Sequence, residues 1–275
     1  MISGERFQNL AQISLYSSPN SNILKQNIKG SCTSIDSVTV EEIKKYRIIF
    51  VYTHDLPLFF DKFYTSLNDV TLISHNSDHG VDESFLPLLD GPNIKKWYCQ
   101  NRLVSHPKLF SLPIGIANSQ WRHGDISTLL STRFSYENKT NLVFKNFQTN
   151  TNSVPRGICN DVTTKNGIAM SPNTGIEQYW KNLSTSSFAI SPVGNGIDCH
   201  RIWECLTLRT VPVVIYHEAF SQFKHLPICF VDKWEDVTLD FLKEEKNKYC
   251  NVEWDLIYNY MQISAWEKII NETSI

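Results

Sequence analysis

The chain has 275 residues, enough for one large domain or two modest domains that each have a core. Hydrophobic residues make up 41% and charged residues 20%, which is typical of a folded globular protein, and the net charge of −2 argues against a broad nucleic-acid-binding surface. The seven cysteines are odd in number and have no C-x-x-C spacing, which indicates reduced thiols rather than a disulfide framework or a zinc site.

Two further observations bear on location. No apolar run approaches the length of a membrane span, and residues 1–12 lack the basic region and apolar core of a secretory signal. We therefore expect a cytoplasmic protein with no membrane span.

The first half of the chain predicts strands that end in polar loops. The first convincing strand covers residues 47–52, after a polar and weakly periodic stretch, and the next covers residues 71–74. Thr53-His54-Asp55 follows the first strand and precedes a helix predicted through Tyr64. The second strand leads into residues 75–80, with the sequence HNSDHG.

These two loops contain the candidate catalytic residues. The carboxyl ends of strands carry the site in open α/β sheets, so both loops stand where chemistry would occur. Asp78 and His79 are favoured because two histidines and a carboxylate converge in their loop. Asp55 is a further candidate, although its place before Pro57 favours a helix cap. An ordinary structural loop is the alternative, since Asn, Ser, Asp and Gly are common turn formers.

The alternation of strands and helices continues through the middle of the chain. Residues 94–99 and 109–116 continue this α/β pattern. Trp121 and the three residues after it could line an acceptor site, but partial burial of Trp121 in the core is the favoured interpretation. The polar stretch 131–140 indicates a connection between two domains.

The predicted domains are residues 1–138 and residues 139–275. A strand at residues 141–144 opens the second domain, and a further strand is predicted over residues 228–232. Residues 254–270 form one amphipathic pattern, with an apolar residue at every fourth position.

The most informative stretch is Ser186–Ile215, SSFAISPVGNGIDCHRIWECLTLRTVPVVI, which predicts a strand, a glycine loop, a helix and a strand. A helix N-terminus behind a glycine loop suits a phosphate, and Arg201 adds a planar fork of donors. Glu204 lies about 4.5 Å further along the helix axis, where its two oxygens could accept both hydroxyls of a ribose. Taken alone, Arg201 and Glu204 would be an ordinary surface pair.

The sequence GNGIDCHRIWECL followed by VPVV resembles the donor-binding segment of exostosin-like glycosyltransferases. The motif GNGIDCHR-x-WE is similar to the corresponding motif of the short exostosin-like proteins of bacteria and large algal viruses. LFSLPIGIANSQW resembles the family's "PiG" segment. The resemblance implies an α/β fold of the GT-B type, with two Rossmann-like domains facing a central cleft and a C-terminal helix, here 254–270, that crosses back to the first domain.

In this family a glutamate holds the nucleotide ribose and basic residues face the diphosphate. The resemblance assigns the first role to Glu204 and the second to Arg201 and His200. Arg156 loosely matches an arginine near the start of the family's second domain. The remaining candidate donor-binding residues belong to the same motif: Asn195, Gly196 and Asp198.

The resulting hypothesis is a glycosyltransferase that moves a sugar from a nucleotide-diphosphate sugar to a hydroxyl of an oligosaccharide or a glycoprotein glycan. The resemblance implies a UDP-sugar, with UDP-xylose the first choice. We expect inversion, with Asp78, His79 or Asp55 as the source of the base. No Asp-x-Asp sequence occurs, so we expect no metal and no other cofactor. If a virus encodes the chain, the expected location is the host cytoplasm.

Two rival functions remain open. One is a non-catalytic protein that binds a glycan or a nucleotide and keeps the fold. The other is an NAD-type oxidoreductase, which is disfavoured because Cys199 stands where the third glycine of the G-x-G-x-x-G fingerprint would be.

Overall fold

The structure is a computed structural model that describes residues 1–17 and 31–272. Contacts divide it into two compact units. The C-terminal unit comprises Gly115–Met261, grouped with Met1. The N-terminal unit comprises Ile2–Ile114 and the segment after Met261 that contains α10 (Ile263–Glu272). Residues 115–138 thus group with the C-terminal unit, and the division into domains 1–138 and 139–275 stays a prediction.

The N-terminal unit contains a six-stranded, all-parallel sheet in the order β2-β1-β3-β4-β5-β6. Its strands are β1 (Ile13–Tyr16), β2 (Ser31–Ser34), β3 (Ile48–Tyr52), β4 (Val70–His75), β5 (Ile94–Gln100) and β6 (Leu109–Leu112). Its helices besides α10 are α1 (Gly4–Gln8), α2 (Val40–Ile43) and α3 (Leu56–Phe63).

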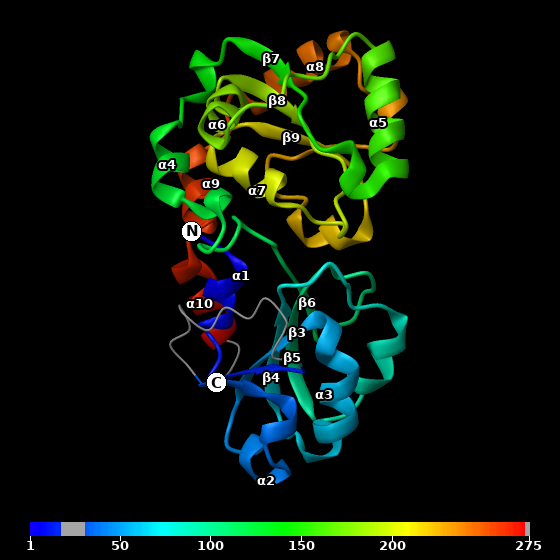
Figure 1. The fold of residues 1–275 in the computed structure, drawn as a ribbon, viewed down its shortest axis with the longest axis vertical. Coiled ribbons are helices and arrows are strands. Elements are labelled where there is room, and N and C mark those ends of the chain that lie inside the picture. The colour runs from blue at the N-terminus through cyan, green and yellow to red at the C-terminus, as the bar shows by residue number, and fades with distance from the viewer. Residues whose placement is uncertain (18–30, 273–275) are drawn as a thin grey trace. The chain divides into compact units, whose positions relative to one another are not determined.

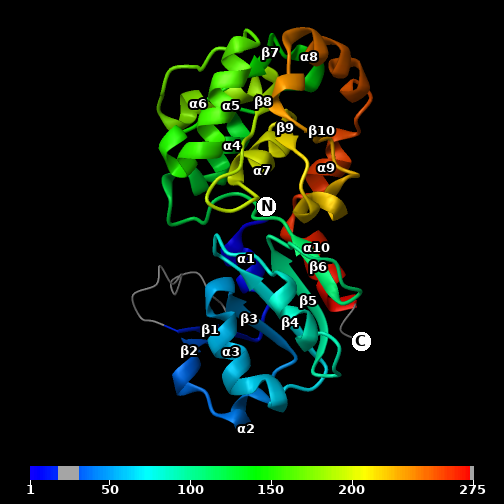
Figure 2. The same cartoon turned by 90° about the vertical axis from the view of Figure 1, so that its right-hand side faces the viewer.

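Side chains alternate between the two faces of this sheet. Ile49 and Val51 of β3 belong to the same buried core cluster as Phe59 of α3. Tyr52 serves the other face, where its hydroxyl donates to Gln8 of α1 at 3.3 Å. Figure 1 and Figure 2 show α3 on one side of the sheet and α1 with α10 on the other. Covering both faces explains why the strands of a parallel sheet are almost continuously apolar.

The C-terminal unit contains a four-stranded, all-parallel sheet in the order β10-β9-β8-β7. Its strands are β7 (Asn141–Phe144), β8 (Ser186–Ile190), β9 (Val211–Ile215) and β10 (Cys229–Val231). Its helices are α4 (Ile126–Ser131), α5 (Ser153–Lys165), α6 (Ile176–Ser184), α7 (His200–Thr207), α8 (Leu239–Lys246) and α9 (Trp254–Tyr260). Figure 2 shows helices on both faces of this sheet.

The predicted α/β class is confirmed, and two parallel sheets flanked by helices are compatible with Rossmann-like domains. One predicted element is wrong. The amphipathic pattern over 254–270 forms two helices, α9 and α10, because the first ends with a cap at Met261 and the second begins at Ile263. Apolar residues can recur at every fourth position on both sides of such a break, so this spacing does not reveal where one helix ends and the next begins. The stretch 131–140, predicted as an interdomain connection, lies inside the C-terminal unit.

Candidate functional site

The strand, glycine loop, helix and strand predicted over Ser186–Ile215 are confirmed as β8, a loop, α7 and β9. The loop folds tightly on itself, since the Gly194 amide donates to the Gly196 carbonyl at 3.0 Å. Asn152 donates to the Gly194 carbonyl at 2.7 Å and holds the loop from outside. A Cβ atom at Gly194 would lie 3.4 Å from a guanidinium nitrogen of Arg156, in van der Waals contact, so the loop passes directly beside that guanidinium.

Glu204 is buried on α7 and lies beside two partners. The Tyr179 hydroxyl of α6 donates to Glu204 Oε2 at 3.4 Å, and Arg201 Nε donates to the Tyr179 oxygen at 3.2 Å. Burial raises the pKa of Glu204 above its ordinary value, and the positive charge of Arg201 opposes that rise. The tyrosine therefore links the carboxylate and the guanidinium that the sequence placed one helical turn apart.

Arg156 and Arg201 lie against one aromatic ring. Their guanidinium carbons are 5.9 Å and 5.8 Å from the centre of the Phe147 ring. Arg156, which is 6% exposed, donates to the carbonyls of Val193 and Gln148, both at 2.8 Å. Burial lowers the pKa of Arg156, and the neighbouring charge of Arg201 lowers it further.

The charges of these two arginines suit an anionic ligand. Within residues 1–17 and 31–272, no acidic side chain lies within ion-pair distance of Arg156 or Arg201. The charge of Glu204 acts on Arg201 from the far side of Tyr179, and a bound diphosphate would relieve the remaining repulsion between the two arginines and gain bidentate hydrogen bonds.

His200, the first residue of α7, is tied to the loop after β6. Its Nδ1 atom lies 2.7 Å from the Gly115 carbonyl, so Nδ1 carries the proton and donates. Gly115 has a φ of 71°, a left-handed conformation that glycine adopts readily. The His200 ring also lies 6.3 Å from His123, which is stacked with Trp121 at 6.1 Å.

The other motif residues have different surroundings. Asn195 is exposed, whereas Gly196 is buried within the loop. Asp198 is buried, and both of its oxygens accept from the indole nitrogen of Trp203, at 2.8 and 2.9 Å. That bond orients the loop against α7, which is a structural task. The donor-binding roles of these three motif residues remain predictions.

The candidate catalytic residues lie in the N-terminal unit, after β3 and β4. Asp55 is buried and accepts hydrogen bonds from the Ser17 amide at 3.0 Å and from the Ser17 hydroxyl. Asp55 does stand at the predicted N-cap position of α3, but its side chain makes no capping hydrogen bond to that helix. His54 lies 3.7 Å from Asp55 and its ring is 6.5 Å from that of His79.

Asp78 and His79 are both exposed. Asn101 holds their backbone by donating to the two carbonyls at 3.3 and 3.4 Å. His75, which the sequence placed in this loop, is instead buried at the end of β4, where its Nε2 donates to the Pro113 carbonyl at 3.0 Å. The loops after β3 and β4 therefore do meet, through the rings of His54 and His79, as parallel pairing of adjacent strands predicts.

Sequence reasoning missed Phe147 and Tyr179 as site residues. Phe147 follows β7 and Tyr179 lies on α6, so both reach α7 only through the fold. One available signal was the position of Phe147 just beyond the carboxyl end of a predicted strand.

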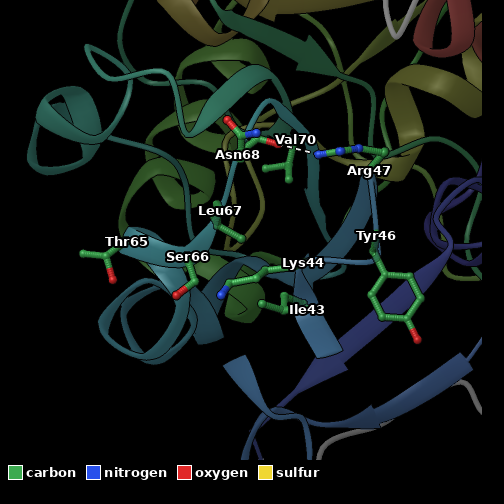
Figure 3. Close-up of a pocket in the computed structure, with 9 residues that line it drawn as sticks. All are labelled: Ile43, Lys44, Tyr46, Arg47, Thr65, Ser66, Leu67, Asn68 and Val70. Carbon is green, nitrogen blue, oxygen red and sulfur yellow. Dashed lines mark hydrogen bonds between the residues drawn. The ribbon is translucent and has the colours of Figure 1, made fainter. Parts of the chain in front are cut away.

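Two hollows of the surface lie away from this site. One, of about 330 Å³, is drawn in Figure 3, where Arg47 donates to the Asn68 carbonyl at 2.8 Å. Arg47 precedes β3 and Val70 begins β4, so the hollow is at the amino ends of these strands, opposite to the loops with Asp55 and Asp78. The other, of about 470 Å³, lies along β7. No predicted site residue lines either hollow.

Among the described residues, no group of three or more His, Cys, Asp and Glu side chains is arranged to hold a metal ion. No helix in the described ranges has both the length and the apolar character that crossing a membrane requires.

Comparison with known proteins relates part of the chain to glycosyltransferases. Residues 129–255 match the family model of the RXYLT1 C-terminal domain, a domain of the xylosyltransferase type. All seven candidate donor-binding residues lie inside the matched range, and the three candidate catalytic residues lie outside it. The comparison with curated proteins found no match.

Proposed function

We propose that this protein transfers a sugar, with xylose the first candidate, from a UDP-linked donor to a hydroxyl of a glycan acceptor. The observation that carries the proposal is the pair of Arg156 and Arg201 beside Phe147, with the buried Glu204 linked to Arg201 through Tyr179, inside the range that matches a glycosyltransferase domain. The proposed architecture is GT-B, supported by the two parallel α/β sheets.

The donor's nucleotide end is assigned to α7. The Glu204 carboxylate accepts hydrogen bonds from the two ribose hydroxyls, and these donors favour its charged form against the effect of burial. Arg201 and Arg156 donate to the diphosphate oxygens, next to the amino end of α7, whose positive dipole end favours the same charge.

The proposed reaction is a direct displacement with inversion. The acceptor oxygen forms a bond to the anomeric carbon while the bond from that carbon to the diphosphate breaks. The acceptor proton passes to a general base, for which Asp78 with His79 is the first candidate and Asp55 the second. The negative charge that develops on the leaving diphosphate is stabilised by Arg201, Arg156 and the end of α7.

The function is tested by Glu204→Ala. Loss of a hydrogen bond to a charged group costs about 1.5–3 kcal/mol, so the Kd for UDP should rise by roughly one to two orders of magnitude, and transfer should be nearly abolished. Calorimetric titration with UDP measures the first effect, and release of UDP from UDP-xylose and other UDP-sugars measures the second.

Glu177→Ala is the matched control, because Glu177 is exposed on the neighbouring α6 and should leave UDP affinity unchanged. Unchanged UDP affinity in a folded Glu204→Ala protein would overturn the assignment. A wild-type protein that binds UDP tightly but neither transfers nor hydrolyses any UDP-sugar would favour a non-catalytic binding protein instead.

A further inference from the structure

The loop between β6 and α4 is fixed at both ends. At its start, the Gly115 carbonyl accepts from His200 of α7. At its end, Asp125 caps α4 by accepting from the Ser127 and Thr128 amides, and hydrogen bonds from Thr128 and Ser127 lower the pKa of Asp125 to about 2. A loop held in this way presents its side chains in a defined position rather than as a mobile surface.

The middle of the loop is equally constrained. The Trp121 amide donates to the Asn118 carbonyl at 3.0 Å, and the Gly124 amide donates to the Trp121 carbonyl at 2.8 Å. A Cβ atom at Gly124 would lie only 2.2 Å from the Asn118 oxygen, so only glycine fits this turn. The turn therefore determines where the Trp121 side chain stands.

That side chain is 47% exposed, although the sequence favoured partial burial in the core. Its ring is nearly parallel to the His123 ring, at an interplanar angle of 16°. Desolvation of the His123 ring lowers its pKa below its ordinary value. The His123 ring stacks on the flat Trp121 indole and lies 6.3 Å from the ring of His200 at the first turn of α7.

A flat aromatic surface of this kind suits a sugar ring. The C–H groups on one side of a pyranose form an apolar face that packs on an indole, while the hydroxyl groups at the ring's edge stay hydrated. The position along α7 agrees with this ligand. If Glu204 holds the ribose, the sugar end of the donor and the acceptor lie toward His200, roughly 6 Å away along the helix axis at about 1.5 Å per residue.

We propose that Trp121 and His123 form a stacking platform for a sugar ring of the acceptor. The proposal rests on the proposed glycosyltransferase function and assigns to these two residues the binding of its glycan acceptor. Glu204 and Arg156, assigned to the donor, are 5% and 6% exposed, whereas Trp121 is 47% exposed. The exposed indole suits an acceptor saccharide, which is a chain that can extend into solvent. It suits less well the single sugar that is transferred from the donor.

The test uses the full-length protein with UDP present and two simple probes, methyl β-D-xylopyranoside and methyl β-D-galactopyranoside. Saturation-transfer NMR should show transfer to the ring protons of at least one probe with the wild-type protein. Trp121→Ala should abolish that signal and Trp121→Phe should keep part of it. Phe134→Ala is the matched control, because Phe134 is also exposed, at 45%, and should leave the signal intact.

A second measurement separates the acceptor from the transferred sugar. In Trp121→Ala the KM for acceptor should rise at least tenfold, while the KM for UDP-sugar and the acceptor-free hydrolysis rate stay within twofold of wild type. A saccharide signal that persists in Trp121→Ala, or that is absent with the wild-type protein, overturns the platform. A raised KM for UDP-sugar with unchanged acceptor KM assigns the platform to the transferred sugar and overturns the acceptor role. Failure of the wild-type protein to bind UDP would instead count against the proposed function itself.

Discussion

At the scale of single residues, two carboxylates in neighbouring loops differ sharply in their surroundings. Asp55 is buried and its oxygens accept from the amide and the hydroxyl of Ser17. Asp78 is exposed to solvent, in a loop whose backbone is held by Asn101. A carboxylate whose two oxygens each already accept a hydrogen bond is less available to take a proton from an acceptor hydroxyl, so the geometry favours Asp78 as the base and a supporting role for Asp55.

We therefore expect Asp78→Asn to lower kcat by at least two orders of magnitude, since a general base contributes about 10²–10⁴-fold. UDP affinity should not change, because the residues assigned to the donor all lie within Gly115–Met261. Steady-state kinetics and calorimetry measure the two quantities, and the exposed Asp61 of α3 supplies the control Asp61→Asn. If Asp78→Asn works at the wild-type rate while a folded Asp55→Asn is inactive, the two loops exchange roles. If neither changes the rate, a retaining or unassisted mechanism is the better account.

The sequence predicted those residues of the site that are close together along the chain. Arg201 and Glu204 lie on one helix, so their proximity follows from helical spacing alone. Tyr179 and Phe147 come from other parts of the chain. Their contacts with α7 depend on the tertiary fold and cannot be predicted from local residue spacing. The exposure of Trp121 was also missed, since a lone tryptophan beside a strand is more often part of the core.

At the scale of elements, one buried ammonium group joins the carboxyl ends of two helices. Lys139 Nζ donates to the Ser184 carbonyl at the end of α6 at 2.6 Å and to the Leu208 carbonyl after α7 at 3.3 Å. It also donates to the Thr210 hydroxyl at 2.8 Å. A cation is favourable at a helix carboxyl end. These are the same two helices that carry Tyr179, Arg201 and Glu204, so Lys139 fixes how they lie against each other.

Burial lowers the pKa of Lys139 from its ordinary 10.5 to about 7, which makes stability depend on pH. Between these values the unfolded chain binds more protons at this site than the folded protein does. Its contribution to the free energy of unfolding therefore rises with pH from 7 toward 10 and is flat below that window. One pKa unit corresponds to about 1.4 kcal/mol, so the rise should amount to several kcal/mol.

The measurement is chemical denaturation at pH 7 and pH 9, compared between wild type and Lys139→Met. The difference in unfolding free energy between the two pH values should be more positive for wild type, because tyrosine and cysteine titrations are common to both proteins. Lys181→Met, on the exposed side of α6, is expected to behave as wild type. An identical pH dependence in Lys139→Met and wild type would show that Lys139 titrates normally.

Strands that are buried on both faces were the easiest elements to predict from the sequence. The strands near residues 47–52, 71–74 and 211–215 were predicted because parallel strands covered on both faces are continuously apolar. β1 and β2 were missed, since each has four residues and the stretch around them is polar. The break between α9 and α10 was missed because apolar spacing continued across Met261.

At the scale of the whole molecule, a chain with net charge −2 concentrates two arginines around one ring of the C-terminal unit. The division of the chain was harder to predict than its sheets. Polar composition pointed to residues 131–140, whereas contacts group residues 115–138 with the C-terminal unit. A polar composition indicates that a segment is exposed to water. It does not show which unit the segment packs against, because that depends on tertiary contacts.

The two fixed guanidinium groups lead to a prediction about metal dependence. The sequence contains no Asp-x-Asp, and Arg156 and Arg201 can supply the positive charge that a leaving diphosphate needs. Transfer should therefore continue at an undiminished rate in excess EDTA. Turnover that disappears with EDTA and returns with Mn²⁺ or Mg²⁺ would contradict this account of the leaving group.

The grouping of α10 with the N-terminal unit has a consequence for the order of folding. Trp266 of α10 packs edge-on against Phe7, and the Tyr98 hydroxyl donates to the Ile269 carbonyl at 3.4 Å. Gly115–Met261 is continuous, so it can form its own core as soon as it has left the ribosome. Ile2–Ile114, although synthesised first, must wait for α10. The half of the protein that is made first is therefore completed last.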